Sequence, residues 1–363
     1  MIKYREIYKT EQLPVTQNRM FAAQSEALNC VKGDVVLSQD METGLIFNRA
    51  FNAKLIEYDS DYQNEQANSL SFRNHLSEVT KIIQRYFSGK SLVEIGCGKG
   101  FFLKHLLSKG FDVKGIDPAY TGEHPTIIKA YFEPNLSLSG EAIILRHVLE
   151  HVPDPVTFLS GVKKANGNKG YIYIEVPCFD WICKHRAWFD IYYEHVNYFR
   201  LQDFYRMFEK VYEAGYLFGG QYLFVVADLA TLQHPKFTEE EMAELPDDFT
   251  QGINNLADVI KNSRYSTGAP RQSAVWGGAS KGVIFTLFMQ RSGATINCVI
   301  DVNPEKQDKY IAGSGLLVYT PENALKILKP KSNIFIMNEN YVSEIITQSG
   351  NKYNYLKVIH EEI

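Results

Sequence analysis

The sequence predicts an α/β protein in which two parallel-sheet units follow a small irregular N-terminal unit. Strand and helix patterns alternate in two separate regions of the chain, as they do in parallel sheets covered by helices. Each region starts with a buried strand that runs into a glycine-rich turn, VEIGCGKG at 93–100 and VWGGASKG at 275–282. The 363 residues provide enough chain for two or three domains of ordinary size. We expect domains at 1–70, 71–265 and 266–363.

The composition and charge exclude several classes of protein. The net charge is −4 and no block of Lys and Arg stands out, so we expect no nucleic-acid partner. No apolar run approaches the roughly 20 residues that span a bilayer, and the start of the chain lacks the apolar region of a signal peptide. We therefore expect a cytoplasmic protein with no membrane partner. Five scattered cysteines form neither a disulfide framework nor a CxxC metal pair, and we expect no bound metal.

The individual elements follow from local patterns. Residues 1–70 combine short apolar pieces with glycine and polar residues, which predicts a few short strands. HLSEVTKIIQRYF (75–87) has helical spacing, and FFLKHLLSKG (101–110) is a helix ended by Gly110. Strands are expected at 91–95, 111–117, 141–147 and 170–177, a helix at 154–165, and a hairpin at 211–229. Residues 237–265 read as acidic helices, and STGAP (266–270) reads as a linker before the alternation restarts.

The first glycine-rich turn has the pattern E-x-G-x-G-x-G, made by Glu94, Gly96, Gly98 and Gly100. Glycine lets the backbone approach a ligand closely, and the helix that follows offers free N–H groups. Several nucleotide cofactors use such a turn. Asp117 ends the next strand, where a carboxylate can accept both hydroxyls of a ribose. Glu94 would repel a pyrophosphate but suits a ligand with a cationic amino-acid end.

Together with the hairpin after the parallel run, these features resemble the class I S-adenosylmethionine-dependent methyltransferases. The resemblance implies a Rossmann-like central domain that binds S-adenosylmethionine and releases S-adenosylhomocysteine. It implies that Phe132, after the third strand, flanks the adenine. A plain α/β turn or an NAD-binding fold is the alternative. The cofactor-contacting residues implied are Glu94, Gly96, Cys97, Gly98, Gly100, Asp117, Pro118, Phe132, Arg146 and His147.

Two histidines follow the fourth strand in LRHVLEHVPDP. His147 and His151 stand at i and i+4 and would share a face if this stretch is helical. His-x3-His can bind a metal, but no third ligand is obvious nearby in the sequence. In methyltransferases this segment lines the floor of the active site, which favours a functional role for His151. For His147, a packing role is an equal alternative.

The stretch FDIYYEHVNYF (189–199) places Glu194 and His195 among aromatic residues, beyond a strand that ends in EVP. In a parallel sheet, a segment beyond the carboxyl end of a strand lies over the ligand crevice. The aromatic residues would then form a dry pocket in which Glu194 and His195 supply proton chemistry. The alternative is that the two residues cap a packed helix, which costs desolvation.

The order EVP and then FD-x-x-Y-x-EH-x-x-YF resembles the three-domain C-methyltransferases that act on nucleotide-linked keto-deoxysugars. The resemblance implies that His195 removes a proton beside a ketone and that Glu194 orients the substrate or assists His195. The resulting carbanion would attack the sulfonium methyl group, while Tyr192 or His151 hydrogen-bonds the enolate oxygen. The turn at 275–282 is similar to the second, Rossmann-like domain of that group, where it would bind a second nucleotide or brace the cleft.

The chain departs from this group at its N-terminus. The group usually begins with a zinc domain built on cysteine pairs, whereas here Cys30 stands alone and QDMET replaces an expected pair. A structural zinc needs four nitrogen or sulfur ligands, so we expect a first domain held by packing. Candidate substrate contacts are Tyr62, Tyr193 and Asn197. Arg146, Arg186 and Lys281 are candidate diphosphate contacts.

The sequence thus predicts methyl transfer from S-adenosylmethionine to a small molecule, most specifically C-methylation beside a ketone of a nucleotide-activated deoxysugar. The nearest alternative is an O- or N-methyltransferase that uses the same histidine on another small polar metabolite. A catalytically silent cofactor-binding protein is a further alternative, against which the joint presence of Glu94, Asp117, Glu194 and His195 argues.

Overall fold

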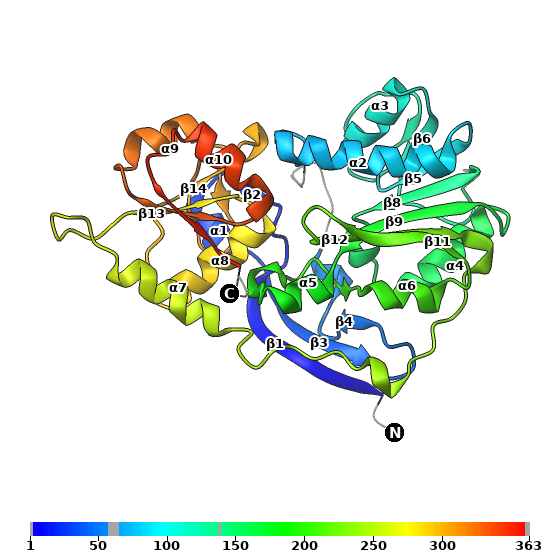
Figure 1. The fold of residues 1–363 in the computed structure, drawn as a ribbon, viewed down its shortest axis with the longest axis horizontal. Helices are drawn as coiled ribbons and strands as arrows, with labels where there is room; N and C mark the ends of the chain where they lie inside the picture. Colours follow the sequence, from blue (N-terminus) through cyan, green and yellow to red (C-terminus); the bar gives the residue numbers. More distant parts are fainter. Residues whose placement is uncertain (1–2, 57–64, 137–138, 360–363) are drawn as a thin grey trace.

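The computed structural model describes residues 3–56, 65–136 and 139–359, which build three main sheets. One sheet has seven strands and lies on the right of Figure 1, a second has five strands and lies on the left, and the long strands of the N-terminal region lie below both. The predicted α/β class is confirmed, with a Rossmann-like core and a second parallel sheet near the C-terminus. No helix in the described part of the chain combines the length and apolarity that crossing a membrane requires.

The N-terminal region is more regular than its sequence predicts. Its elements are β1 (Tyr4–Pro14), β2 (Met20–Phe21), α1 (Gln24–Leu28), β3 (Lys32–Asp40) and β4 (Ile46–Asn48). β1 and β3 form a long antiparallel pair instead of short strands. β4 continues this sheet to β10 (Asn197–Tyr198), a strand that lies far away in the sequence. This pairing fastens the Glu194–His195 segment to the N-terminal sheet.

The central sheet has the strand order β11-β12-β9-β8-β5-β6-β7. Its strands are β5 (Ser91–Ile95), β6 (Asp112–Ile116), β7 (Ile127–Ile128), β8 (Ala142–Arg146), β9 (Tyr171–Pro177), β11 (Val211–Leu217) and β12 (Tyr222–Asp228). β12 runs antiparallel to both β9 and β11, which confirms the predicted terminal hairpin. In Figure 1, α2 (Leu70–Phe87) and α3 (Phe101–Ser108) cover one face, while α4 (Pro155–Ala165) and α6 (Leu201–Met207) cover the other.

The C-terminal sheet has the order β16-β14-β13-β17-β18 and is parallel throughout. Its strands are β13 (Ser273–Trp276), β14 (Cys298–Ile300), β16 (Val318–Tyr319), β17 (Asn333–Ile336) and β18 (Asn354–Lys357). Its helices are α8 (Ser280–Arg291), α9 (Pro321–Ile327) and α10 (Val342–Gln348), and α7 (Gln251–Asn262) precedes it. β15 (Tyr310–Ile311) pairs with β2, so the N-terminal region also holds this unit.

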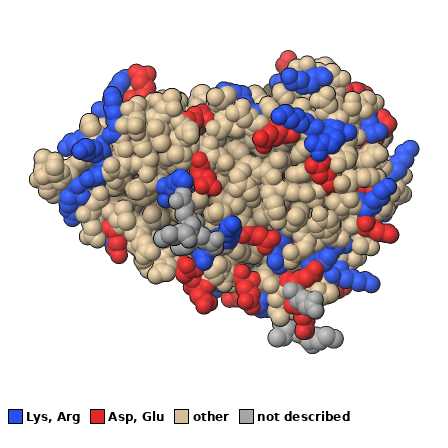
Figure 2. All heavy atoms as spheres, viewed as in Figure 1, with Lys and Arg blue, Asp and Glu red and all other residues tan. Residues whose placement is uncertain are grey.

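The helix expected at FTEEEMAEL does not form, and only Glu239–Glu241 adopts a short 3-10 turn. Three consecutive glutamates repel one another, and prolines at 235 and 246 limit the segment on both sides. On the face drawn in Figure 2, positive and negative side chains are interspersed, as expected for a net charge of −4.

One apolar core runs between the units. Trp188 is buried and stacks on Phe285 of α8, with 5.9 Å between ring centroids and 18° between planes. This contact joins α8 to the short 3-10 turn Trp188–Asp190, which directly precedes the Glu194–His195 segment. The catalytic candidates are therefore packed against the C-terminal unit as well as against the N-terminal sheet.

Close packing at the second glycine turn predicts a stability effect. A Cβ on Gly282 would lie 1.8 Å from the carbonyl oxygen of Gly277, so Gly282→Ala should lower the free energy of unfolding by about 1–3 kcal/mol. Urea unfolding followed by circular dichroism measures this loss. The matched control is Gly161→Ala in α4, where a Cβ meets only Pro134 at 3.2 Å, and this variant should be as stable as the wild type. Equal stability of both variants would contradict the packing argument.

Candidate active site

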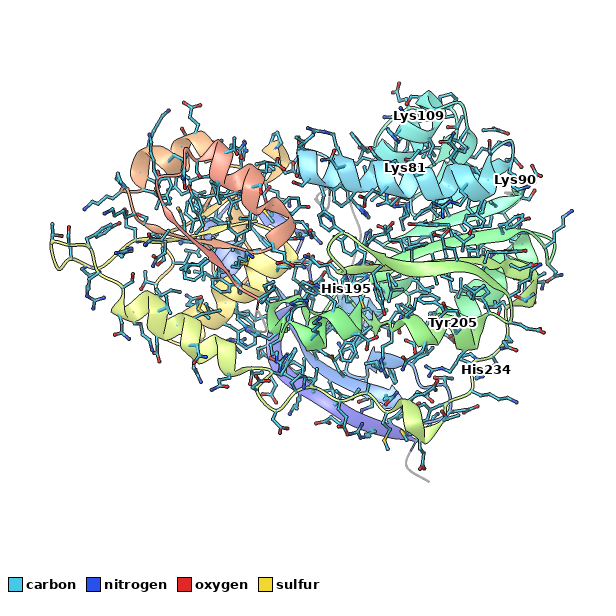
Figure 3. All side chains as sticks on the ribbon, in the orientation of Figure 1. Lys81, Lys90, Lys109, His195, Tyr205 and His234 are labelled. Atoms are coloured by element: carbon cyan, nitrogen blue, oxygen red, sulfur yellow. The ribbon has the colours of Figure 1, made fainter. Side chains whose placement is uncertain are left out.

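A cavity of about 690 Å³ opens at the carboxyl ends of the central strands and extends to the glycine turn of the C-terminal sheet. All three regions of the chain line it. Asn18 comes from the N-terminal region, the first glycine turn from the central sheet, and Trp276 to Gly282 from the C-terminal unit, with Gly278 set back from the wall. Figure 3 shows His195 between the two lobes. The cavity is thus the place where the separate candidate residues meet.

Most of the expected cofactor residues line this cavity: Glu94, Gly96, Cys97, Gly98, Asp117, Pro118, Phe132, Arg146 and His147. Gly100 does not line it. Gly100 precedes α3 with a φ of 75°, and a Cβ there would lie 2.5 Å from the Ile127 side chain. Glycine is therefore required at this position by the backbone turn into α3 and by close packing. The Asp117 carboxylate is fixed by the N–H groups of Gly98 and Ala119, each donating over 2.8 Å.

Glu94 is buried at the end of β5, and its Oε2 has no hydrogen-bond partner within the described residues. Burial raises the pKa of Glu94 to about 7, against the opposing effect of Arg146, and Asp117 and Glu175 contribute to the rise. A buried carboxylate without a partner is costly. A ligand with a cationic group would satisfy it, as the sequence predicted for this position.

A second buried carboxylate, Glu175 at the end of β9, lies in a dense network of hydrogen bonds and ion pairs. It contacts His75 of α2 at 2.9 Å and Arg146 at 3.3 Å, and Tyr173 donates its hydroxyl over 2.8 Å. Although burial opposes ionisation, Arg146 and the two histidines hold the pKa of Glu175 well below its usual range. His75 was not recognised from the sequence because its partner, Glu175, lies 100 residues away in the chain. Tyr173 was not recognised because it belongs to an ordinary buried strand.

His147 and His151 do not share a helical face, so that conditional expectation is corrected. His147 has a φ of 53°, and only Leu149–His151 forms a 3-10 turn. The proline at 153 disfavours helical backbone in the residue before it, which keeps a helix from continuing. His147 instead bridges Glu150 at 3.3 Å and Glu175 at 3.1 Å. Burial alone would lower its pKa, but these two hydrogen bonds raise the pKa of His147 to about 9.

His151, Tyr192 and His195 meet in the cavity. The His151 and His195 rings have centroids 5.0 Å apart, and the Tyr192 hydroxyl lies 3.0 Å from His195 Nε2. Burial, and then His151, His147 and Lys281, hold the pKa of His195 well below its usual range. The imidazole is therefore neutral near pH 7 and has a lone pair that can accept a proton. Burial also raises the pKa of Tyr192 well above its usual range, so its hydroxyl keeps its proton.

Glu194 points away from the cavity. Its carboxylate accepts the backbone N–H groups of Gln17 and Asn18, and its own carbonyl lies 2.9 Å from Nδ1 of His151. Glu194 therefore fastens the histidine segment to the N-terminal region and orients His151 through its backbone.

Two of the expected substrate residues, Tyr193 and Asn197, lie outside the cavity lining. Tyr193 accepts the N–H of Asn52 and packs against Gly33, and Asn197 donates to the carbonyls of Leu149 and Val152. Tyr62 lies outside the described residues. Arg186 pairs with Asp248 at 3.0 Å, away from the cavity lining.

The second glycine turn repeats the geometry of the first. The N–H of Gly278 donates to Asp301, which ends β14, over 2.8 Å, as Gly98 does to Asp117. Lys281 reaches into the cavity and pairs with Asp190 at 2.9 Å. The cavity wall here also includes Asn303, Lys306 and Asn338. The glycine turn was visible in the sequence, but no motif marks Asn303, Lys306 or Asn338.

Comparison with known proteins decides the class. Residues 68–211 match the family model described as a methyltransferase domain, and residues 243–355 match the model described as a C-methyltransferase C-terminal domain. The chain is a methyltransferase. No curated protein matches the sequence of this methyltransferase.

Solved structures similar to this methyltransferase share low sequence identity with it. A SAM-dependent methyltransferase from Aquifex aeolicus is 16% identical, with a TM-score of 0.33. The matched region covers 45% of this chain and 95% of the Aquifex chain. The PH0226 protein from Pyrococcus horikoshii OT3 is 14% identical with a TM-score of 0.36, covering 47% and 94%. A SAM-dependent methyltransferase from Methanosarcina mazei is 18% identical with a TM-score of 0.32, covering 42% and 98%.

Glu94, whose Oε2 has no hydrogen-bond partner among the described residues, predicts a pH-dependent affinity for S-adenosylmethionine. If this carboxylate binds the ammonium group of the cofactor, the attraction is lost below pH 7, where the carboxyl group of the free enzyme takes up a proton. We expect affinity to fall by roughly five- to tenfold for each pH unit below 7. Calorimetric titration between pH 5.5 and 7.5 measures this, since the cofactor ammonium keeps its proton in that range.

The variant Glu94→Gln should bind the cofactor weakly at every pH in this range and lose the pH dependence. Glu209→Gln, at an exposed position after α6, is the matched control and should behave as the wild type. An unchanged pH profile in Glu94→Gln would show that another group is responsible.

Proposed function

We propose that this methyltransferase transfers a methyl group to the carbon beside a ketone in a nucleotide-linked deoxysugar, with His195 as the general base. The observation that carries the proposal is the position of neutral His195, beside Tyr192 and His151, in one cavity that reaches both glycine turns. The match of residues 243–355 to a C-methyltransferase C-terminal domain supports transfer to carbon.

The cofactor end of the cavity fits S-adenosylmethionine. Glu94 supplies a buried carboxylate for the ammonium group, and Asp117 supplies a fixed carboxylate for the ribose hydroxyls. Gly98 faces open space, because a Cβ there would meet nothing within 4 Å. Phe132 lines the wall beyond Asp117, where an adenine would stack. When bound, the cofactor supplies an electrophilic methyl group on a sulfonium.

The chain's own residues account for activation of the substrate. A ring nitrogen of His195 takes the proton from the carbon beside the ketone, and the electron pair moves into an enolate. Tyr192, which keeps its proton, is placed to donate a hydrogen bond to the enolate oxygen. The carbanion forms a bond to the methyl carbon, the methyl–sulfur bond breaks, and S-adenosylhomocysteine leaves. The proton remains on His195 until it returns to solvent.

The C-terminal end of the cavity suits the nucleotide part of the substrate. Asp301 has the same relation to Gly278 that Asp117 has to Gly98, so it would accept ribose hydroxyls. Lys281 and Lys306 supply positive charge for a diphosphate between the nucleoside and the sugar. The sugar would then lie near His195, midway between the two glycine turns.

Hydrogen exchange tests the base. With S-adenosylhomocysteine bound, the wild-type enzyme in D₂O should place deuterium on the carbon beside the ketone of a nucleotide keto-deoxysugar. His195→Gln should slow this exchange by roughly 10²–10⁴-fold, because glutamine cannot take the proton. NMR follows the exchange. His234→Gln, a distant and exposed histidine in Figure 3, is the control.

Cofactor binding by His195→Gln should remain at the wild-type level, which separates loss of the base from loss of the fold. Exchange at the wild-type rate in this variant would refute the role of His195. Methylated product without any exchange in the wild type would indicate O- or N-methylation instead.

Truncation of the substrate tests the nucleotide end. Removing the nucleoside should lower kcat/KM by roughly 100-fold, since contacts at the second glycine turn are lost. Asp301→Asn should reduce the difference between full and truncated substrates, while the exposed-site variant Asp308→Asn should not. Steady-state kinetics with both substrates measure this. An unchanged difference in Asp301→Asn would place the nucleotide elsewhere.

A further inference from the structure

Three side chains with metal-binding atoms converge in the cavity: Glu150, His151 and His195. Each offers one ligand atom, and these atoms all lie within 4.8 Å of one another. The sequence showed no third ligand for a histidine pair. The fold supplies the third ligand, because His195 is brought from 44 residues beyond His151.

Glu150 is the least satisfied member of the group. Its side chain is 1% exposed, and its Oε2 has no hydrogen-bond partner among the residues that the structure describes. The other oxygen, Oε1, lies 3.3 Å from Nδ1 of His147. A buried carboxylate oxygen at a cavity wall needs a donor or a cation. The proposed transfer reaction gives Glu150 no role, so this oxygen is unexplained by it.

The two histidines have outer partners of the kind that metal ligands use. Nδ1 of His151 lies 2.9 Å from the carbonyl oxygen of Glu194, which places the proton on Nδ1 and the lone pair on Nε2. Nε2 of His195 lies 3.0 Å from the Tyr192 hydroxyl. Histidine ligands commonly bond a carbonyl, carboxylate or water through the second ring nitrogen, which fixes the ring and its tautomer.

We propose that Glu150, His151 and His195 bind a divalent transition-metal ion of the Zn²⁺ type. Two imidazoles and one carboxylate favour such an ion over Mg²⁺ or Ca²⁺, which prefer oxygen ligands. Ligands about 2.0–2.1 Å from Zn²⁺ lie roughly 3.3 Å apart in a tetrahedron, so the side chains close by at most roughly 1.5 Å. All three residues line the cavity, so water or a substrate atom could supply a fourth ligand from it.

The surrounding charges permit a cation here. Lys281 is paired with Asp190 at 2.9 Å, and His147 contacts Glu175 at 3.1 Å as well as Glu150. His147 thus shares its two ring nitrogens between Glu150 Oε1 and Glu175. The oxygen of Glu150 that remains for the ion is Oε2, which has no hydrogen-bond partner among the described residues.

Metal binding has a direct consequence for the proposed reaction. The metal takes the lone pair of a His195 ring nitrogen and occupies the cavity beside it, so the base cannot accept a proton. The ion acts as a reversible inhibitor of proton abstraction. This consequence rests on the proposed function, whereas binding itself does not.

Calorimetry with ZnCl₂ tests the site on EDTA-treated, S-adenosylhomocysteine-loaded enzyme. One ion should bind per chain, and CoCl₂ should give the visible absorption of nitrogen-ligated Co²⁺. Glu150→Gln and His151→Gln should each weaken Zn²⁺ binding by about 30-fold or more, in line with the loss of a direct ligand. His234→Gln should bind as the wild type, and MgCl₂ should give no binding.

Wild-type affinity for S-adenosylhomocysteine in each variant shows that the fold is intact. Absence of Zn²⁺ binding to the wild type would overturn the proposal. Equal binding by Glu150→Gln, His151→Gln and the wild type would overturn it as well, since the ion would then lie elsewhere.

Deuterium exchange tests the consequence. Saturating Zn²⁺ should stop exchange into the substrate, and EDTA should restore it. Undiminished exchange on the metal-saturated enzyme would overturn the inhibitory role. If the metal-free wild type shows no exchange, the proposed function fails, and the calorimetric result still decides the metal site.

Discussion

Burial of the Glu175 carboxylate is the constraint on which the active-site region depends. A charge inside the protein is tolerated only when it is paired and hydrogen-bonded. Here the partners come from the neighbouring strand β8, from β9 itself and from α2: Arg146, His147, Tyr173 and His75. Their convergence fixes the carboxyl ends of two central strands. Glu94 differs, because its Oε2 has no hydrogen-bond partner among the described residues, and we propose that a cationic ligand satisfies it.

A second constraint connects the three regions of the chain. Glu194 uses its carboxylate to hold the backbone of the N-terminal region and its carbonyl to orient His151, so it positions the site without lining the cavity. The β4–β10 pairing and the stacking of Trp188 on Phe285 hold the same segment from two other sides. His195 is therefore placed by contacts to every region, which explains why an acid–histidine pair occurs in so aromatic a stretch.

The sequence was sufficient where the determining contacts are local. Glu94, Gly98 and Asp117 lie on one strand–turn–helix–strand unit, so their pattern alone predicted a ligand site and the central fold. It was insufficient where partners are distant in the chain: His75 meets Glu175 across 100 residues, and Gln17 meets Glu194 across 177. The i, i+4 spacing of His147 and His151 was compatible with a helix. The spacing of side chains carries no information on backbone angles, so it could not show that His147 has a left-handed backbone. Tyr193 and Asn197 were expected at the substrate because their neighbours are there, although strand pairing and backbone hydrogen bonds turn them away.

One cavity reaches both glycine turns, and we propose that the first turn binds the cofactor and the second binds the nucleotide of the substrate. Calorimetric titration of nucleotide sugars into the enzyme, with and without S-adenosylhomocysteine, tests this most directly. The account predicts that S-adenosylhomocysteine binds on its own and that one nucleotide sugar then binds the loaded enzyme more tightly than the free enzyme. Cofactor binding with no response to any nucleotide sugar would contradict it and would assign the cavity to a different small substrate.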